Sequence, residues 1–237
     1  MRSLFRLNSK VSLFLLMLAG ALALHPAGAA ILCTDLPPST LQVDGVKTSK
    51  VEEMMVPSEA LDRSGQAVGL ASRHTLMLTV IDLAVWFNIA HRVVPRADGL
   101  VCDAPSLVHM GFGASRRRAF LARPAAMDAC VRQQMLDHEA AHNRAFDEVV
   151  GRFIAQHRSD FQRGMVALKQ TPAPTPEAAK ARWETGLKVL LTEARQQLLT
   201  DIQSANAHVD DPSALAALEN ACGGKIRQLE QTQPLIP

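Results

Sequence analysis

Hydrophobic residues recur with a helical period through most of the second half of the chain. From Asp128 to Thr171 they return every three or four positions, and Gly and Pro are almost absent. This spacing puts the hydrophobic side chains on one face of an amphipathic helix. The segment TPAPTP, residues 171–176, ends that helix because proline lacks an amide hydrogen and disfavours helical geometry in the residue before it. The same pattern from about Glu177 to Ala207 predicts a second long helix, and hence a helical hairpin.

A short third helix is predicted near the end of the sequence. Asp211 is a favourable N-cap residue, and Pro212 suits the first helical position, where no amide hydrogen is needed. We expect this helix to run to Cys222, because Gly223 and Gly224 follow it.

The first half of the chain carries shorter hydrophobic runs between turn-forming residues, as strands do. Leu41–Val43 predicts a short strand. The apolar run from Thr75 to Val94 is interrupted by polar residues and allows one bent strand, two strands or a buried helix. Leu107–Phe112 and Ala119–Arg123 predict a hairpin joined by the residues between them. Strands followed by helices predict an α+β fold, with a small N-terminal antiparallel sheet followed by the long helical hairpin.

The first thirty residues have the three parts of an export signal. Three basic residues precede a hydrophobic stretch from Val11 to Leu24, and residues 27–29, AGA, fit a small-residue cleavage site. We therefore expect residues 1–29 to be a signal peptide and residues 30–237 to form a single domain in the periplasm or outside the cell. The hydrophobic stretch is short for a membrane span and nothing later supplies one, so we expect no stable span after cleavage.

The four cysteines, Cys33, Cys102, Cys130 and Cys222, all remain after such a cleavage. An even number at wide spacing in an oxidising compartment predicts two disulfides, whereas structural zinc sites use closely spaced cysteine pairs. Three pairings are possible, and spacing does not choose among them. We expect Cys102 to pair with Cys130, and Cys33 to pair with Cys222 and so join the two ends.

The net charge of +2 is close to balance and does not suggest a nucleic acid as a partner. The tightest basic run, Arg116–Arg118, is expected to be a solvated turn.

The segment MLDHEAAHNRAF, residues 135–146, contains the pattern HExxH. His138 and His142 are one helical turn apart on the same face, so both imidazoles can reach one ion. Glu139 lies about 100 degrees further round the helix. Zinc with three protein ligands keeps a water in its open position, lowers the pKa of that water toward about 7, and leaves a nearby carboxylate to take the proton. The motif predicts a zinc site with Glu139 as general base; the competing interpretation is a polar helix face that binds nothing.

The residues around this motif resemble those of the zincin group of metallopeptidases. The similarity covers Cys102–Phe146, in particular SLVHMGFGASRRRAFLARPAAMDACVRQQMLDHEAAH, and extends to small exported bacterial proteins of unknown function that are predicted to be zinc proteases. HVDDPSALAALENAC, from His208 to Cys222, also resembles the closing helix and Cys of such proteins. The resemblance implies that an edge strand, Ala119–Arg123 or Leu107–Phe112, lies beside the active helix and binds substrate along it.

The third ligand of the better-known zincins is missing from its usual place. In metzincins HExxH continues to a Gly and a third His, but this chain has Ala145 and Glu148 at those positions. In gluzincins the ligand is a Glu on the next helix, which makes Glu184 or Glu193 a candidate. If the two long helices form an uninterrupted antiparallel hairpin, Glu193 faces a point ~18 Å along the axis from His142, at ~1.5 Å per residue.

The same antiparallel register places positions near 205 and 209 opposite the two histidines of the motif. We therefore predict Asp210 as the third ligand, with His208 as an alternative. A break in the first helix at Gly151 or Gly164 would undo this register and bring back Glu193. The competing interpretation is that the residues at the helix end only cap it or interact with its dipole.

Together these patterns predict an exported metallopeptidase that hydrolyses peptide bonds with Zn²⁺ as its cofactor. Its expected substrates are peptides or proteins, including peptides of the cell wall. The alternative is a non-catalytic envelope protein that binds metal or serves as a scaffold.

Overall fold

The computed structural model describes residues 32–48, 50–67, 75–169 and 171–232. The predicted signal peptide lies outside these ranges, so its assignment stays a prediction. No helix in the described ranges is long and apolar enough to cross a membrane.

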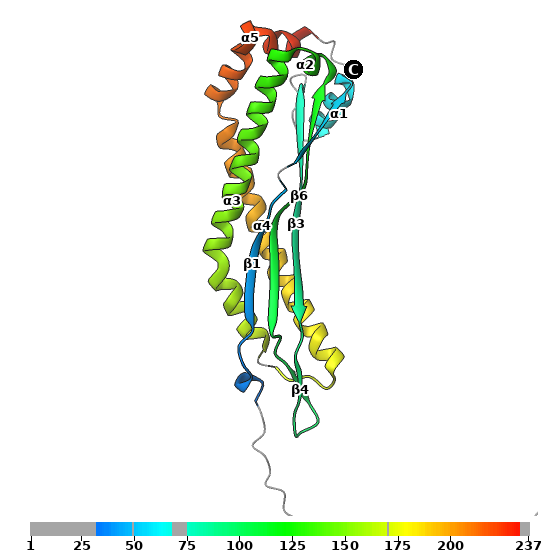
Figure 1. The fold of residues 1–237 in the computed structure, drawn as a ribbon, viewed down its shortest axis with the longest axis vertical. Helices are drawn as coiled ribbons and strands as arrows, with labels where there is room; N and C mark the ends of the chain where they lie inside the picture. Colours follow the sequence, from blue (N-terminus) through cyan, green and yellow to red (C-terminus); the bar gives the residue numbers. More distant parts are fainter. Residues whose placement is uncertain (1–31, 49, 68–74, 170, 233–237) are drawn as a thin grey trace, which may run out of the picture. The chain divides into compact units, whose positions relative to one another are not determined.

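The main sheet is built around one long strand, β6, which runs from Leu107 to Ala122 (Figure 1). Strand β3, Met77–Ala90, pairs with it antiparallel along nearly its whole length. Because a strand has two edges, β1 (Thr40–Val46) and β2 (Val51–Val56) share the other edge, where both pair with β6 in parallel. Strand β6 is therefore the central strand, and the far edge of β3 has no strand partner among the described residues.

The predicted hairpin between Leu107 and Arg123 is wrong, because these residues up to Ala122 form a single strand. Gly113 does not turn the chain; it lets β1 approach closely, since a Cβ built there would lie 2.0 Å from the backbone oxygen of Val46. The apolar run that starts at Thr75 resolves into the one long strand β3, with the short strand β4 (Val93–Pro95) after it.

A bulge in β6 reverses which of its residues face the helices. The register with β3 shifts between Asp82 and Leu83, and Ser115 is the extra residue of β6 at that point. Before the bulge, Phe112 and Ala114 face the core, and after it Arg117 and Ala119 do. An extra residue produces this change because side chains alternate along a strand with a period of two. The solvated turn predicted at Arg116–Arg118 is therefore wrong, and Arg117 is only 4% exposed.

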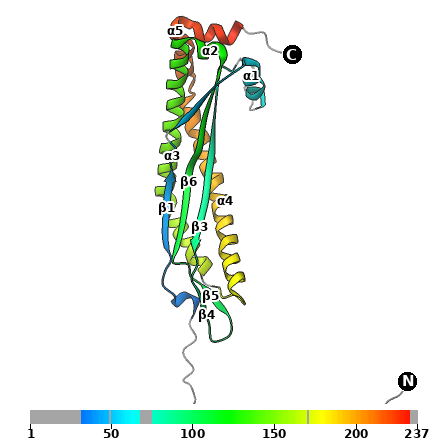
Figure 2. The ribbon, with the colours of Figure 1, turned by 45° about the vertical axis from the view of Figure 1, so that its right-hand side comes forward.

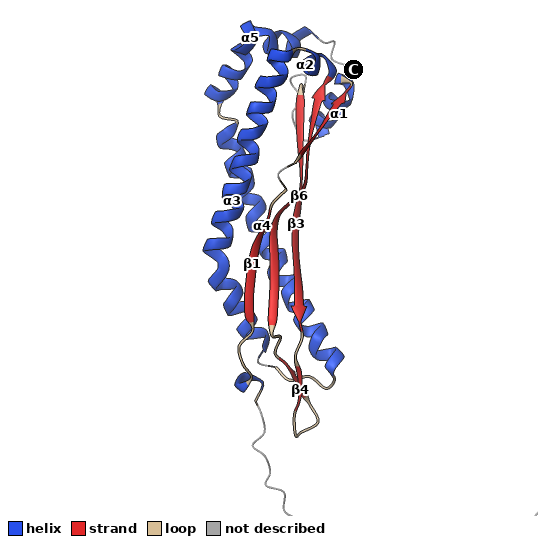
Figure 3. Cartoon of the chain, viewed as in Figure 1, coloured by secondary structure: helices blue, strands red, loops and turns tan. Residues whose placement is uncertain are grey.

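Two long antiparallel helices, α3 (Ala129–Lys169) and α4 (Pro176–Val209), cover one face of the sheet (Figures 1 and 2). Asp128 caps α3 by accepting from the amides of Cys130 and Val131, and the Thr175 hydroxyl caps α4. Figure 3 shows the strands and helices as separate layers, so the predicted α+β class and helical hairpin are confirmed. The antiparallel part of the sheet is the β3–β6 pair.

The hydrophobic core fills the space between the sheet and this hairpin. Aromatic rings of Phe112, Phe153 and Phe161 meet there, with Phe112 and Phe161 stacked at 5.4 Å between centroids. Trp183 of α4 is 2% exposed and donates from Nε1 to the backbone oxygen of Asp103 at 2.9 Å. Helix α3 continues without a break through both of its glycines, so the register of the hairpin holds along its length.

The last helix, α5 (Pro212–Thr232), contains a bend at the predicted stop. Residues 222–224 have positive φ angles of 56°, 68° and 80°, a conformation that glycine adopts at little cost. Beyond the bend the chain becomes helical again, and Ile226 is fully buried in a second hydrophobic cluster with Val131 and Met135 of α3.

Two disulfides are present, as predicted, but the expected pairing is wrong. Cys33 pairs with Cys102, with Cα atoms 5.3 Å apart, and Cys130 pairs with Cys222 at 5.9 Å. The parallel pairing of β1 with β6 brings the segment before β1 to the strand that precedes β6, and the bend in α5 lies over the start of α3.

The remaining elements are short and join these layers. They are the 3-10 helix η1 (Cys33–Asp35), the antiparallel pair β4 (Val93–Pro95) and β5 (Val101–Asp103), and the helices α1 (Ser58–Ala67) and α2 (Arg123–Met127).

Candidate metal centre

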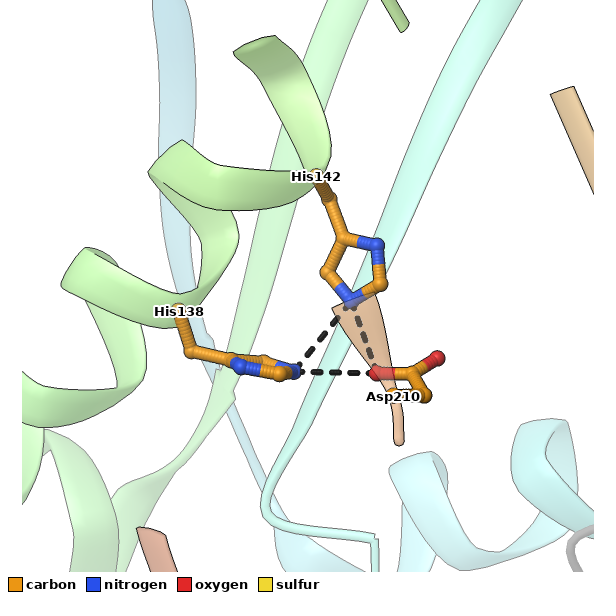
Figure 4. Close-up of side chains that lie close together, drawn as sticks. All are labelled: His138, His142 and Asp210. Atoms are coloured by element: carbon orange, nitrogen blue, oxygen red, sulfur yellow. Dashed lines mark hydrogen bonds and ion pairs between the residues drawn. The ribbon is translucent and has the colours of Figure 1, made fainter. Parts of the chain in front are cut away.

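His138 and His142 of α3 meet Asp210 at the end of α4 (Figure 4). The Nε2 atoms of the two histidines are 3.2 Å apart, and Oδ1 of Asp210 lies 3.1 Å from one and 3.0 Å from the other. All three side chains point toward one another, and each offers one ligand atom to a shared centre. Asp210 is thus placed where the antiparallel register predicted it.

The register of the helical hairpin explains this placement. Asn206 and Asp210 lie one turn apart on α4 and face the two histidines, which lie one turn apart on α3. The Nδ1 atom of His142 is 3.1 Å from Oδ1 of Asn206, an oxygen that accepts a hydrogen bond when Nδ1 carries the proton. This tautomer leaves a lone pair on Nε2, which points toward Asp210.

The two alternative ligands are not brought to this centre. His208 is exposed, and its Nδ1 lies 2.7 Å from the backbone oxygen of Ser204. Glu193 is exposed on α4, and the metal-ligating cluster found in the described part of the chain does not include it. The Glu193 alternative depended on a break in α3, which the structure does not have.

The spacing of the three ligand atoms suits a zinc ion. Ligands about 2.0–2.1 Å from a tetrahedral zinc are about 3.3 Å from one another, and two imidazoles with one carboxylate are a usual donor set for catalytic zinc. The ligand atoms here are 3.0–3.2 Å apart, so a small outward movement admits the ion. Burial and the neighbouring His142 lower the pKa of His138, against the opposing effect of Asp210. The neutral imidazole that results is the form that binds a metal.

Glu139 lies on the inner side of the motif, 2% exposed, between the helix and the sheet. Its Oε2 accepts a hydrogen bond from the Thr79 hydroxyl of β3, and its Oε1 accepts one from Nδ2 of Asn143 at 2.5 Å. Burial raises the pKa of the Glu139 carboxyl, and the bond from Thr79 and the nearby His142 oppose that rise. A carboxyl with a raised pKa is suited to exchanging protons near neutral pH.

A groove of about 640 Å³ opens onto these residues. Its walls come from the start of β3, the motif face of α3, the end of α4, and α5, and they are mostly hydrophobic. The hydrophobic lining residues are Leu76, Met77, Leu78, Ile81, Leu83, Met135, Phe146, Leu199, Ile202, Leu215 and Leu218. The groove therefore places a hydrophobic surface directly beside the candidate metal ligands.

The strand beside the groove is β3, not either of the two expected from the zincin resemblance. Leu107–Phe112 and most of Ala119–Arg123 belong to β6, which is central and paired on both edges, and Arg123 begins α2. Residues 77–79, 81 and 83 of β3 line the groove, together with Thr75 and Leu76 just before this strand. The far edge of β3 has no strand partner among the described residues.

Three residues of the centre were missed in the sequence. Thr79 comes from a strand distant in sequence and has no local signal. Asn143 and Asn206 do have a local sequence signal, which is their spacing. Asn143 is one turn after Glu139 and Asn206 is one turn before Asp210, so each lies on the same helix face as its neighbour.

No family model, curated protein or solved structure matches this chain.

Proposed function

We propose that this protein is an exported zinc-dependent metallopeptidase whose zinc is held by His138, His142 and Asp210. The observation that carries the proposal is the position of Asp210, which comes from another helix and approaches both ring nitrogens of HExxH to 3.1 Å or less. A helix face that binds nothing would not need a carboxylate at this point, because each imidazole could instead face solvent.

The residues of the chain divide the chemistry among them. A bound zinc lowers the pKa of water and polarises a carbonyl. Glu139 takes a proton from the attacking water and delivers it to the leaving amine. Its two hydrogen bonds leave lone pairs on both carboxylate oxygens, so it can still accept that proton.

The groove favours an extended peptide as substrate. Strand β3 has one edge without a strand partner among the described residues, and the backbone donors and acceptors of that edge would let a peptide add as a further strand. The hydrophobic walls fit apolar side chains on either side of the cleaved bond. An export signal would deliver the enzyme to peptides or proteins in the periplasm or outside the cell, cell-wall peptides among them.

The second candidate is a non-catalytic metal-binding protein of the envelope. The observation that favours it is the environment of Glu139, because both of its oxygens are already engaged by side chains of the protein. A carboxylate held in this way could serve only to brace the motif helix against β3.

Two measurements distinguish the candidates. Purified protein is expected to bind zinc at one ion per chain, measured by elemental analysis. Glu139→Gln should keep the zinc and lose hydrolysis of a quenched-peptide library by a factor of about 10² to 10⁴. Glu148→Gln, at an exposed position of the same helix, is the matched control and should cleave normally.

Each outcome bears on one candidate. Stoichiometric zinc without any peptide cleavage by the wild type would support the non-catalytic candidate. A protein that binds no zinc, or a Glu139→Gln variant as active as wild type, would overturn the metallopeptidase proposal.

A further inference from the structure

Arg117 is a buried arginine that reaches the motif helix from the sheet. Its side chain is 5% exposed, and one terminal nitrogen donates to Oδ1 of Asn143 at 2.9 Å. The other terminal nitrogen donates to Oδ1 of Asp147 at 2.5 Å, and the guanidinium lies 5.3 Å from the centre of the Phe146 ring. The planar guanidinium is thus fixed in position and in orientation.

Asn143 connects Arg117 to Glu139. Because its Oδ1 accepts from Arg117, its Nδ2 must point the other way, where it donates to Oε1 of Glu139 at 2.5 Å and to the Glu139 backbone oxygen at 3.1 Å. The opposite amide orientation would put an NH₂ group against the guanidinium and a carbonyl oxygen against the carboxylate. Both contacts would be repulsive, so Arg117 selects the orientation in which Asn143 holds Glu139.

Arg117 is poorly explained as a stabilising residue. A buried charge carries a desolvation cost that its partners often do not recover. Its Nε has no hydrogen-bond acceptor among the described residues, which adds to that cost. It points inward only because the bulge at Ser115 changes the facing of β6, whereas Arg116, one residue earlier, is exposed.

We propose that Arg117 is a positioning residue of the hydrolytic reaction, acting through Asn143 to hold the Glu139 carboxylate where it takes a proton from water. Thr79 binds the other carboxylate oxygen, so the carboxylate is held from both sides. This inference rests on the proposed metallopeptidase function. It adds a requirement that the HExxH motif alone does not contain, namely a cation on the central strand and an amide one turn after the base.

The test compares Arg117→Met, Asn143→Ala and the double variant, all loaded with zinc. Each single variant should lower kcat about 10- to 100-fold on the best-cleaved quenched peptide, with KM and zinc affinity changed less than threefold. The double variant should be no slower than the slower single variant, because both changes break the same chain of contacts. Arg116→Met, the exposed neighbour of the same charge, should behave as wild type.

A conservative variant covers the case in which Arg117→Met does not fold. Arg117→Lys keeps a cation that can donate to Asn143, and it should recover most of the lost kcat. The proposal is overturned if Arg117→Met keeps kcat within twofold of wild type. It is also overturned if the two single losses multiply in the double variant, because Arg117 would then act independently of Asn143.

A structural readout separates this inference from the proposed function. In crystals of zinc-loaded protein, the Glu139 carboxylate should rotate away from its position in Arg117→Met and keep it in Arg116→Met. If wild type cleaves no peptide, the metallopeptidase proposal is wrong, whatever the carboxylate does. If wild type is active and the carboxylate does not move in Arg117→Met, the positioning role is wrong while the enzyme assignment stands.

Discussion

The disulfide between Cys130 and Cys222 links the two segments that supply the candidate metal ligands. Cys130 lies in the first turn of α3, ahead of the two histidines, and Cys222 lies at the bend of α5, which follows Asp210. Replacing both cysteines by Ala removes the covalent link between the bend and α3 and changes none of the candidate ligand residues. We expect this change to weaken both the fold and the binding of zinc.

The expected loss of stability follows from the length of chain that the bridge closes. A separation of 92 residues corresponds to about 4.6 kcal/mol of unfolding free energy in the chain-entropy model. The other bridge, Cys33–Cys102, closes 69 residues and corresponds to about 4.4 kcal/mol, so it is a matched control. Because Cys33 and Cys102 are both almost fully buried, their loss removes packing as well and should cost at least as much.

The two bridges should differ in their effect on zinc. With zinc removed, urea unfolding followed by circular dichroism should show a loss of about 4 kcal/mol or more for each Cys-to-Ala pair. Competition with a chromophoric chelator, at a temperature where both variants are folded, should show about tenfold weaker zinc binding only for Cys130→Ala/Cys222→Ala. Equal zinc affinities in the two variants would refute the view that this bridge positions Asp210.

Three further changes test the site and its frame. Asp210→Ala should weaken zinc binding at least about 100-fold with little loss of unfolding free energy. Asp211→Ala removes the cap of α5, so it should lower the unfolding free energy by about 1 kcal/mol and leave zinc affinity unchanged. The bond from Lys225 is the main cause of the lowered pKa of Asp128. This carboxylate therefore stabilises the fold above its unfolded pKa near 3.8, and the effect is lost as pH falls through the lower folded pKa. Lys225→Met should flatten the change in unfolding free energy between pH 6 and pH 3. Trp183→Phe leaves a buried carbonyl of β5 without its donor and should cost about 1–3 kcal/mol in urea unfolding, and an unchanged midpoint would contradict this.

The helical hairpin was predictable because its geometry is fixed by the backbone. A helix rises by a constant amount per residue, and the connection between α3 and α4 is short, so the facing positions follow from residue numbers. The same reasoning found Asp210 from His138 and His142, although nothing in the local sequence marks it as a ligand. The prediction depended on α3 having no break at Gly151 and Gly164, which the structure bears out.

The sheet was less predictable because its pairing joins residues far apart in the chain. Gly113 and the arginines after it resemble a turn, yet they continue a strand because β1, β2 and β3 all pair with that segment. The disulfide pairing failed for the same reason, since it follows from which strands meet and not from cysteine spacing. The parallel addition of β1 brings Cys33 to Cys102, a contact that spacing along the chain gave no reason to prefer.

The surroundings of Glu139 depend both on the residue spacing along the helix and on the strand pairing in the sheet. The helix supplies Asn143 through a spacing of four, which a sequence reader can see. The sheet supplies Thr79 and Arg117, and both point at Glu139 or its amide partner because of the β3–β6 register and the bulge at Ser115. If these contacts hold the base for reaction, catalysis depends on a sheet register that the motif does not encode. If they only brace the helix, Arg117→Met should keep the same kcat as Arg116→Met, and the kinetic comparison of these two variants distinguishes the two roles.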